Sequence, residues 1–357
     1  MKEKIVDEIK ALMDSIGRPV RLMEVCGTHT VAIFRQGIRN ILPDGIGLLS
    51  GPGCPVCVTS VKDVDTAIAI SKLDGVVLTT FGDMMRVPGD RKSLSDAKAE
   101  GGDVRTVYSP LDALQIAEKK RDTNVVFFAT GFETTSPSVA GTILEAERMG
   151  IPNFSIYSVH KTVPPALKAL LDSGEVKVDG FILPGHVSTV IGSIPYAFMA
   201  SDYRKPSVIT GFDANDILSG IVMLLRQVSS GRAEVEIQYS RVVKREGNPK
   251  ALSILEELFE PDDAEWRGIG TIPGSGLRLR KKYRHRDVRT VFDLKVPQGS
   301  EPKACSCGDV LKGIKIPSDC LLFGKACTPD KPVGACMVSS EGSCAAYYKY
   351  KTVFDRT

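Results

Sequence analysis

From residue 1 to about residue 235, short runs of β-branched and other apolar residues alternate with segments whose apolar positions have a helical spacing. This alternation is typical of a parallel sheet covered by helices. The apolar runs predict strands at residues 21–25, 46–49, 75–79, 104–107, 124–129, 153–159, 180–183 and 207–209. Eight strands are too many for one small sheet. We therefore expect two doubly wound α/β lobes that flank a cleft, formed by residues 1–118 and 119–235.

After Gly231 the pattern changes. A helix is expected over residues 248–259, and it is followed by a stretch rich in proline and glycine, a basic run and a cysteine-rich tail. Residues 236–357 are therefore predicted to form a third, smaller domain.

Distinctive residues directly follow the predicted strands. They are Cys26 and His29, then Cys54 and Cys57, Asp83, Glu133, His160 with Lys161, and His186. Because the carboxyl ends of parallel strands form the ligand crevice in open α/β sheets, we expect these residues to face one shared cleft between the lobes.

The balance of charge limits the classes of partner. Charged residues make up 25% of the 357 residues and the net charge is +3, which gives no general argument for a polyanionic partner. A basic run over residues 278–289 is interrupted by Asp287, and only Tyr283 is available there to stack on bases. We expect small-molecule or protein partners and no nucleic acid.

No apolar run reaches the ~18 residues that a membrane helix needs. The first ten residues mix charge into an amphipathic pattern that is unlike a signal peptide. We expect a cytoplasmic protein without a membrane partner.

The nine cysteines occupy both ends of the chain, and none lies between Cys57 and Cys305. Cytosolic thiols are kept reduced, so metal ligation or redox chemistry is favoured over a set of structural disulfides. The distribution predicts two separate thiol sites.

In the tail, Cys307, Cys320, Cys327 and Cys344 are separated by twelve, six and sixteen residues. Zinc and mononuclear iron favour tight ligand pairs, whereas a [4Fe-4S] cluster gathers thiolates from irregular spacings. We therefore predict a [4Fe-4S] cluster on these four residues. A metal that only stabilises a small domain is the alternative. Cys305 and Cys336 stay unassigned: they form a redox pair, or Cys336 replaces one of the four ligands.

Near the start of the chain, Cys54 and Cys57 form a C-x2-C motif at the expected N-terminus of a helix that begins near Ser60. A helix N-terminus favours thiolate over thiol. Together with Cys26, these thiols suit either a redox pair with a nucleophile or a transient iron site. An isolated cysteine such as Cys26 is more often a small buried residue.

Four other candidates have both a functional and a structural interpretation. His29 and His186 either take part in the cleft chemistry or form ordinary hydrogen bonds, and Asp83 and Glu133 are either cleft acids or helix caps. The grouping of three of the four histidines at strand ends favours function.

Several long motifs together resemble the HypD family of hydrogenase maturation factors. They are MEVCGTHT at residues 23–30, GPGCPVCV at 51–58, TFGDMMRVP at 80–88, FATGFETT at 128–135, and a tail match from FGKACTP at 323–329 to MVSSEG at 337–342. The resemblance covers almost the whole chain.

The resemblance implies a function in assembling the Fe(CN)2CO moiety of nickel-iron hydrogenases, as a scaffold and electron-transfer protein rather than a conventional turnover enzyme. Cys26, Cys54 and Cys57 would hold a transient iron that carries cyanide and carbon monoxide, and Cys26 would share it with a HypC-type chaperone. A HypE-type protein, supplied by a HypF-type carbamoyltransferase, would donate cyanide from a thiocyanate. The family's cluster environment, similar to ferredoxin:thioredoxin reductase, implies electron flow toward the cleft thiols.

Two other classes remain open. One is an iron-sulfur dithiol/disulfide oxidoreductase that acts on a protein partner. The other is an adaptor protein whose cysteine-rich tail is stabilised by a zinc ion.

Overall fold

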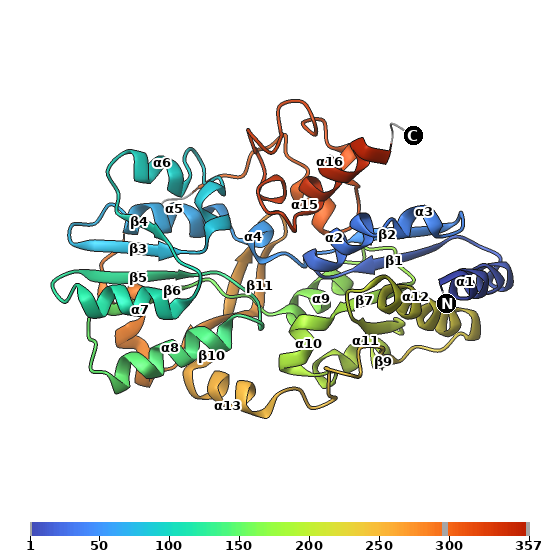
Figure 1. Cartoon of the computed structure of the whole chain (residues 1–357), viewed down its shortest axis with the longest axis horizontal. Helices are drawn as coiled ribbons and strands as arrows, with labels where there is room; N and C mark the ends of the chain where they lie inside the picture. Colours follow the sequence, from blue (N-terminus) through green and yellow to red (C-terminus); the bar gives the residue numbers. More distant parts are fainter. Residues whose placement is uncertain (1, 295–298, 355–357) are drawn as a thin grey trace.

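The computed structural model describes residues 2–294 and 299–354, and two parallel sheets stand toward opposite ends of an elongated molecule (Figure 1). The first sheet has the strand order β2-β1-β7-β8-β9 and the second has the order β4-β3-β5-β6. The first sheet comprises β1 (Val20–Glu24), β2 (Ile46–Ser50), β7 (Gly180–Pro184), β8 (Ser207–Thr210) and β9 (Val235–Ile237). The second comprises β3 (Val76–Thr80), β4 (Val104–Thr106), β5 (Asn124–Ala129) and β6 (Phe154–Ser158). The predicted α/β class is confirmed.

Successive residues of a strand point to opposite faces of its sheet, and here the residues on both faces are apolar and buried. Helices therefore cover both faces of each sheet. Leu22 packs against α1 and α12, whereas Met23 packs against α9. In the second sheet, Phe127 packs against α7 and α8, and Phe128 against α5 and α6. The helices of the two lobes are α1 (Lys2–Ile16), α2 (Gly27–Arg35), α3 (Ile38–Ile41), α4 (Pro55–Val58), α5 (Val61–Ile70), α6 (Leu94–Ala99), α7 (Pro110–Lys119), α8 (Ser136–Arg148), α9 (Val163–Asp172), α10 (Gly185–Ile191), α11 (Ala197–Ser201) and α12 (Ala214–Ser230).

The eight predicted strands are present, but the sheets do not divide the chain at residue 118. Strands β3 and β4 pair with β5 and β6, and β7 to β9 pair with β1 and β2. The chain crosses from the first lobe to the second after β2 and returns after β6. The expectation of two consecutive lobes assumed that strands close in sequence share a sheet. In this fold, strands β7 to β9 instead pair in parallel with β1 and β2, which lie far away in the sequence.

Residues 236–357 do not form one separate domain. Strand β9 completes the first sheet, and α13 (Pro249–Leu258) packs with the hairpin of β10 (Phe259–Trp266) and β11 (Gly270–Leu279) on the second lobe. Helix α13 was predicted, but the hairpin was not. Its prolines and glycines masked the strand pattern. Helix α14 (Val288–Val291) then lies against β6.

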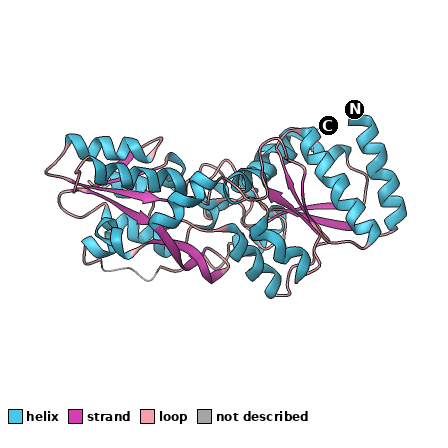
Figure 2. Cartoon of the chain, turned by 90° about the horizontal axis from the view of Figure 1, so that it is seen from below, coloured by secondary structure: helices cyan, strands magenta, loops and turns pink. Residues whose placement is uncertain are grey.

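The cysteine-rich segment lies above the junction between the two lobes in Figure 1. Figure 2 shows the molecule from below, with strands flanked by helices toward both of its ends. The helices of the cysteine-rich segment are α15 (Cys307–Leu311) and α16 (Ser343–Phe354), with short 3-10 turns η4 (Pro317–Asp319) and η5 (Ala335–Met337). Helix α16 contacts α2, and η5 contacts α4. No helix in residues 2–294 and 299–354 is both long and apolar enough to cross a membrane.

The turn between β10 and β11 packs against this segment through a close backbone contact. A Cβ atom at Gly268 would collide with the backbone of Gly308, and Gly268 has φ +71°. The turn is thereby held between α4 and the cysteines of the tail.

Replacing Gly268 by alanine is expected to destabilise the protein more than replacing Gly274, which has φ +64° but nothing within 4 Å of its would-be Cβ. Both substitutions place a side chain on a left-handed backbone, which destabilises the folded state by roughly 1–2 kcal/mol. Gly268→Ala adds overpacking of roughly 1–3 kcal/mol. Midpoints of thermal and urea unfolding measure the difference, and equal midpoints for the two variants would refute the interlock.

Candidate functional site

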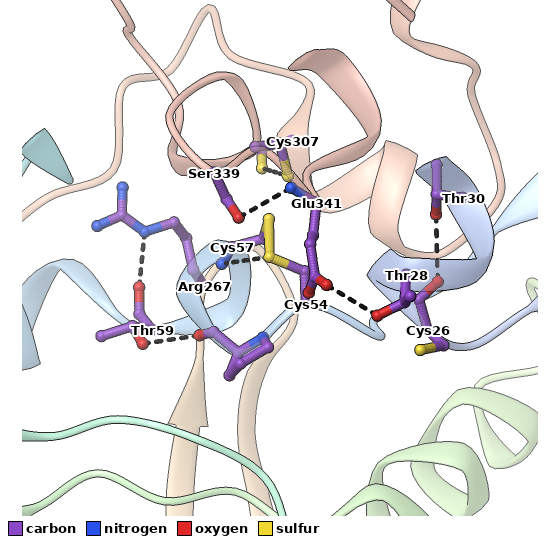
Figure 3. Close-up of a disulfide and its surroundings, with 12 residues drawn as sticks. Cys26, Thr28, Thr30, Cys54, Cys57, Thr59, Arg267, Cys307, Ser339 and Glu341 are labelled. Atoms are coloured by element: carbon purple, nitrogen blue, oxygen red, sulfur yellow. Dashed lines mark hydrogen bonds between the residues drawn. A yellow bond between two sulfur atoms is a disulfide. The ribbon is translucent and has the colours of Figure 1, made fainter. Parts of the chain in front are cut away.

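The loops that carry the front cysteines meet through their backbones. Gly27 N donates to Gly53 O at 3.0 Å, and a Cβ atom at Gly53 would collide with the backbone of Cys26. Because β1 and β2 are adjacent parallel strands, their ends lie side by side and bring Cys26 and Cys54 to the same edge of the sheet. The backbones of the two loops therefore meet, whereas Figure 3 shows the sulfur of Cys26 apart from the Cys54–Cys57 pair.

Cys54 and Cys57 form a disulfide, with Cα atoms 5.3 Å apart (Figure 3). Both are buried, at 4% and 0% exposure. Cys54 precedes the single turn of α4, and its sulfur accepts from Cys57 N at 3.3 Å. Ser60 then caps α5, where a helix start was expected. The motif is therefore an oxidised pair in this structure rather than the two thiolates that the helix argument favoured.

Cys26 is a free cysteine at the start of α2, 8% exposed. Burial raises the pKa of its thiol to about 12, so at neutral pH it carries a proton that a bound metal must displace. It lines a cavity of about 440 Å³ together with Phe132, Thr134 and His186.

A neighbouring cavity of about 400 Å³ is lined by Cys54, Asp83 and Tyr108. Asp83 is exposed at the start of a 3-10 turn, η1 (Gly82–Arg86). Glu341, which the sequence did not single out, lines both cavities. Glu341 belongs to the cysteine-rich segment, and its Oε1 accepts a hydrogen bond from Thr28 Oγ1 at 2.8 Å (Figure 3). The expected cleft is thus a pair of adjoining cavities joined at Glu341.

Glu133 lines neither cavity. Its Oε1 accepts from Val163 N, at the start of α9, at 2.9 Å, while Oε2 is buried without a hydrogen-bond partner. Burial raises the pKa of this carboxyl to about 7. The arrangement matches the helix-cap interpretation of this residue.

The histidines do not gather as expected. His186 alone among His29, His160 and His186 lines the cavity of Cys26, where it stacks on Phe212. His29 donates from Nε2 to Gly211 O at 2.9 Å, and burial lowers its pKa to about 4. His160 is also buried, which lowers its pKa to about 3, and it lies at a different cavity. The position of a residue at a strand end determines where its backbone lies but not where its side chain points. The sequence therefore predicted three histidines in the cleft, and only His186 lines the cavity of Cys26.

At the rear, all six tail cysteines line one small cavity with apolar neighbours such as Val310 and Phe323. The four predicted ligands, Cys307, Cys320, Cys327 and Cys344, are among them, with Cys305 and Cys336. Cys307 Sγ lies 2.7 Å from Cys336 Sγ. Val333 N donates to Cys327 Sγ at 3.3 Å.

This donor set suits an iron-sulfur cluster. Within the described ranges, no group of three or more His, Cys, Asp or Glu side chains is arranged to hold a metal ion as it stands. A single zinc ion needs its ligands converged on one point, whereas the thiolates of a cluster surround a larger body. A cavity ringed by cysteines and apolar side chains fits the second case.

Comparison with known proteins identifies the family. The HypD family model, described as "Hydrogenase formation hypA family", matches residues 1–351. The chain belongs to the HypD family. It is 48% identical to the hydrogenase maturation factor HypD of Rhodobacter capsulatus, over 97% of this chain and 94% of the relative. It is 49% identical to HypD of Azotobacter vinelandii, over 93% of this chain and 90% of the relative, and 46% identical to HypD of Cupriavidus necator, over 94% and 90%.

The HypD motifs at residues 23–30 and 51–58 supply the two loops that touch at Gly53, and the tail match supplies Glu341. Two further residues of the site escaped the sequence analysis. Glu24 is buried between Cys26 N and Thr30, and burial raises its pKa to about 7. Arg267 is buried beside the front disulfide, and its Nε donates to Thr59 O at 2.8 Å (Figure 3). A glutamate inside a predicted strand and an arginine in a Gly-rich turn carry no local signal of burial.

Glu133→Gln is expected to change how stability depends on pH. The carboxyl has a pKa of about 7 in the folded protein, against 4.5 for an ordinary glutamate, so between these pH values the folded state binds a proton that the unfolded state has released. Relative to Glu133→Gln, the wild type loses stability as the pH rises from about 4.5 to about 7, by roughly 3 kcal/mol in total, and the difference is constant above that.

Urea unfolding of both proteins at several pH values measures this difference. Glu24 titrates in both, so its contribution cancels. Parallel stability curves would show that Glu133 is not a buried proton carrier.

Proposed function

We propose that this chain holds the iron that becomes the Fe(CN)2CO moiety of nickel-iron hydrogenases and supplies electrons for adding its cyanide ligands. The observation that carries the proposal is that the loops bearing Cys26 and Cys54 touch at Gly53, and that these two cysteines line adjoining cavities. Sulfur is the ligand type that suits a low-spin iron fragment with strong-field ligands. A HypC-type chaperone sharing the iron, and a HypE-type cyanide donor supplied by a HypF-type carbamoyltransferase, belong to the same proposal.

The oxidised state of Cys54 and Cys57 fits the redox part of this function. Release of cyanide from a thiocyanate consumes two electrons, R–S–CN + 2e⁻ → R–S⁻ + CN⁻. Oxidation of a dithiol to a disulfide yields two electrons and two protons. One turnover of this pair therefore balances one cyanide transfer, and the pair must then be reduced again.

A path for that reduction is supported by the packing behind the disulfide. Cys307 and Cys336 form a close thiol pair in the same buried core as Cys54, Cys57 and Trp266. Cys336 lies on η5, which contacts α4. A [4Fe-4S] cluster in the rear cavity would supply the electrons, and thiol-disulfide exchange passes them between cysteine pairs.

This pairing also revises the ligand set. Six cysteines line the rear cavity, and a thiol pair at Cys307 and Cys336 leaves four, namely Cys305, Cys320, Cys327 and Cys344. We propose these four as the ligands in place of the set that contains Cys307.

Among the other candidates, His186 and Asp83 line the cavities, and in this proposal they exchange protons or donate a hydrogen bond to a cyanide nitrogen. His29 and Glu133 hold backbone atoms instead. A dithiol/disulfide oxidoreductase is the second candidate function, because the Cys54–Cys57 disulfide next to a thiol pair is equally suited to reducing a protein partner.

Infrared spectra of the complex, purified without oxygen together with its natural partners, are expected to contain cyanide and carbon monoxide stretches that disappear in Cys26→Ala. Thr189→Ala is the matched control because it changes the same cavity without removing sulfur, and it should keep the bands. An intact wild-type complex without these bands would favour the oxidoreductase.

Iron and sulfide content tests the ligand set. Cys305→Ser is expected to lose most of both, since it removes a ligand, whereas Cys307→Ser should keep about four irons per chain. Loss in Cys307→Ser with retention in Cys305→Ser would restore the set predicted from sequence. Zinc without sulfide in the wild type would favour the adaptor.

A further inference from the structure

A cavity of about 460 Å³ lies beside the end of β6. Its walls come from β6 and the residues that follow it, the start of α5, the β10–β11 hairpin and α14. Its lining residues in the described part of the chain include no cysteine. The volume is in the range of small-molecule sites, roughly 300–1,000 Å³. His160 and Lys161, which the sequence placed at a strand end, line this cavity rather than those at the front cysteines.

His160 contributes a hydrogen-bond acceptor to the lining. Its side chain is 1% exposed, and Nε2 is buried without a hydrogen-bond partner among the residues that the structure describes. Ser158 Oγ donates its single proton to Leu277 O at 2.8 Å, so it accepts from Nδ1–H of His160 at 3.0 Å. Burial lowers the pKa of His160 to about 3, which leaves Nε2 with a free lone pair at neutral pH. A hydrogen-bond donor is therefore expected at this nitrogen.

A metal ion does not meet this need. Nowhere in residues 2–294 and 299–354 are three or more His, Cys, Asp or Glu side chains arranged to hold one. An N–H group of a small molecule is the donor that suits both the neutral ring and a carboxylate beside it.

Lys161 and Asp63 form a loose ion pair at the same cavity. Lys161 is 2% exposed, and its Nζ lies 3.7 Å from Asp63 Oδ2. This distance is longer than that of a hydrogen bond, which spans roughly 2.7–3.2 Å. The exposed pair of Lys168 and Asp172 is closer, at 2.8 Å. Because a buried ammonium is costly unless acceptors surround it closely, a further anionic acceptor is expected at Lys161.

The buried groups together match one ligand head. Tyr157 OH donates to Asp63 Oδ1 at 2.9 Å, which holds the carboxylate in place and leaves Oδ2 for another donor. A ligand with an anionic and a cationic group side by side satisfies Lys161 and Asp63 at once. An α-amino acid carries this combination, a carboxylate and an ammonium on one carbon atom.

The exposed residues of the lining favour one kind of amino-acid side chain. Four of them are acidic, namely Asp262, Asp263, Glu265 and Asp293, and two are basic, namely Lys62 and Arg289. Arg289 already donates to Ser158 O at 3.0 Å, and Asp262 lies 3.8 Å from Arg278. The remaining carboxylates outnumber the remaining cation, so the rim attracts a positively charged group.

We propose that this cavity binds a free α-amino acid with a basic side chain. Its carboxylate accepts from Lys161 Nζ, its ammonium donates to Asp63 Oδ2 and His160 Nε2, and its side chain faces the acidic rim. The site is separate from the iron site of the proposed function and does not depend on it.

Isothermal titration calorimetry of the full-length protein, purified without oxygen, tests the proposal with L-arginine as the probe. One L-arginine is expected to bind per chain. Agmatine, which lacks the carboxylate, and N-acetyl-L-arginine, which lacks the ammonium, should each bind more weakly by about tenfold or more, because each loses a charged contact. L-Glutamate should be weaker by a similar factor because the rim repels its side chain.

Variants assign the binding to this cavity. Lys161→Met is expected to weaken L-arginine binding by about tenfold or more. Lys168→Met is the matched control, since it removes an exposed lysine that also pairs with an aspartate, and it should bind as the wild type does. His160→Phe covers the case in which Lys161→Met does not fold: it removes the acceptor but neither buried charge, and binding should weaken by about tenfold. Thermal unfolding shows which variants are folded.

Several results would overturn the proposal. They are no binding of L-arginine to the wild type at millimolar concentration, equal binding of agmatine or L-glutamate, unchanged affinity in folded His160→Phe, and an equal loss in Lys168→Met. Cys26→Ala should bind L-arginine as the wild type does, so failure of the proposed iron site would leave this result intact.

Discussion

The backbone contact between Gly53 and Cys26 is the constraint on which the arrangement of the site depends. Only a residue without a side chain allows the second loop to lie against the first. Adjacent parallel strands bring the two loops to one edge, and the contact then fixes the Cys54–Cys57 turn beside α2. The cavities, the position of Glu341 and the approach of the rear cysteines follow from this placement.

The groups around this contact are mostly uncharged. Burial favours the neutral forms of Cys26, Glu133 and His29, by raising the pKa of the first two and lowering that of the third. Arg267, at 2% exposure, is a buried charge beside the front disulfide (Figure 3). Such surroundings strengthen the effect of any single charge, because little water is present to screen it. They also protect reactive sulfur from side reactions.

The sequence predicted the strands well because buried parallel strands are continuous apolar runs, such as residues 124–129. It also located the motifs at the strand ends. It did not predict which strands share a sheet, since pairing depends on contacts between distant residues. The β10–β11 hairpin was missed because Pro261 and Pro273 interrupt its pattern. Within the site, the cysteines were recognised from their spacing in the sequence. The contact between the sulfur atoms of Cys307 and Cys336 depends on the folding of the tail and was seen only in the structure.

The two crossings of the chain between lobes have a consequence for the order of folding. Strands β3 to β6 form a continuous stretch, so their sheet has all its strands once residue 158 has left the ribosome. Strands β1 and β2, although made first, wait for β7, β8 and β9 from residues 180–237. Closing so long a loop is slow, and the unpaired edge of β1 stays exposed meanwhile. The nascent amino-terminal segment, with three cysteines already synthesised, is therefore the part of the chain most in need of protection by chaperones during translation.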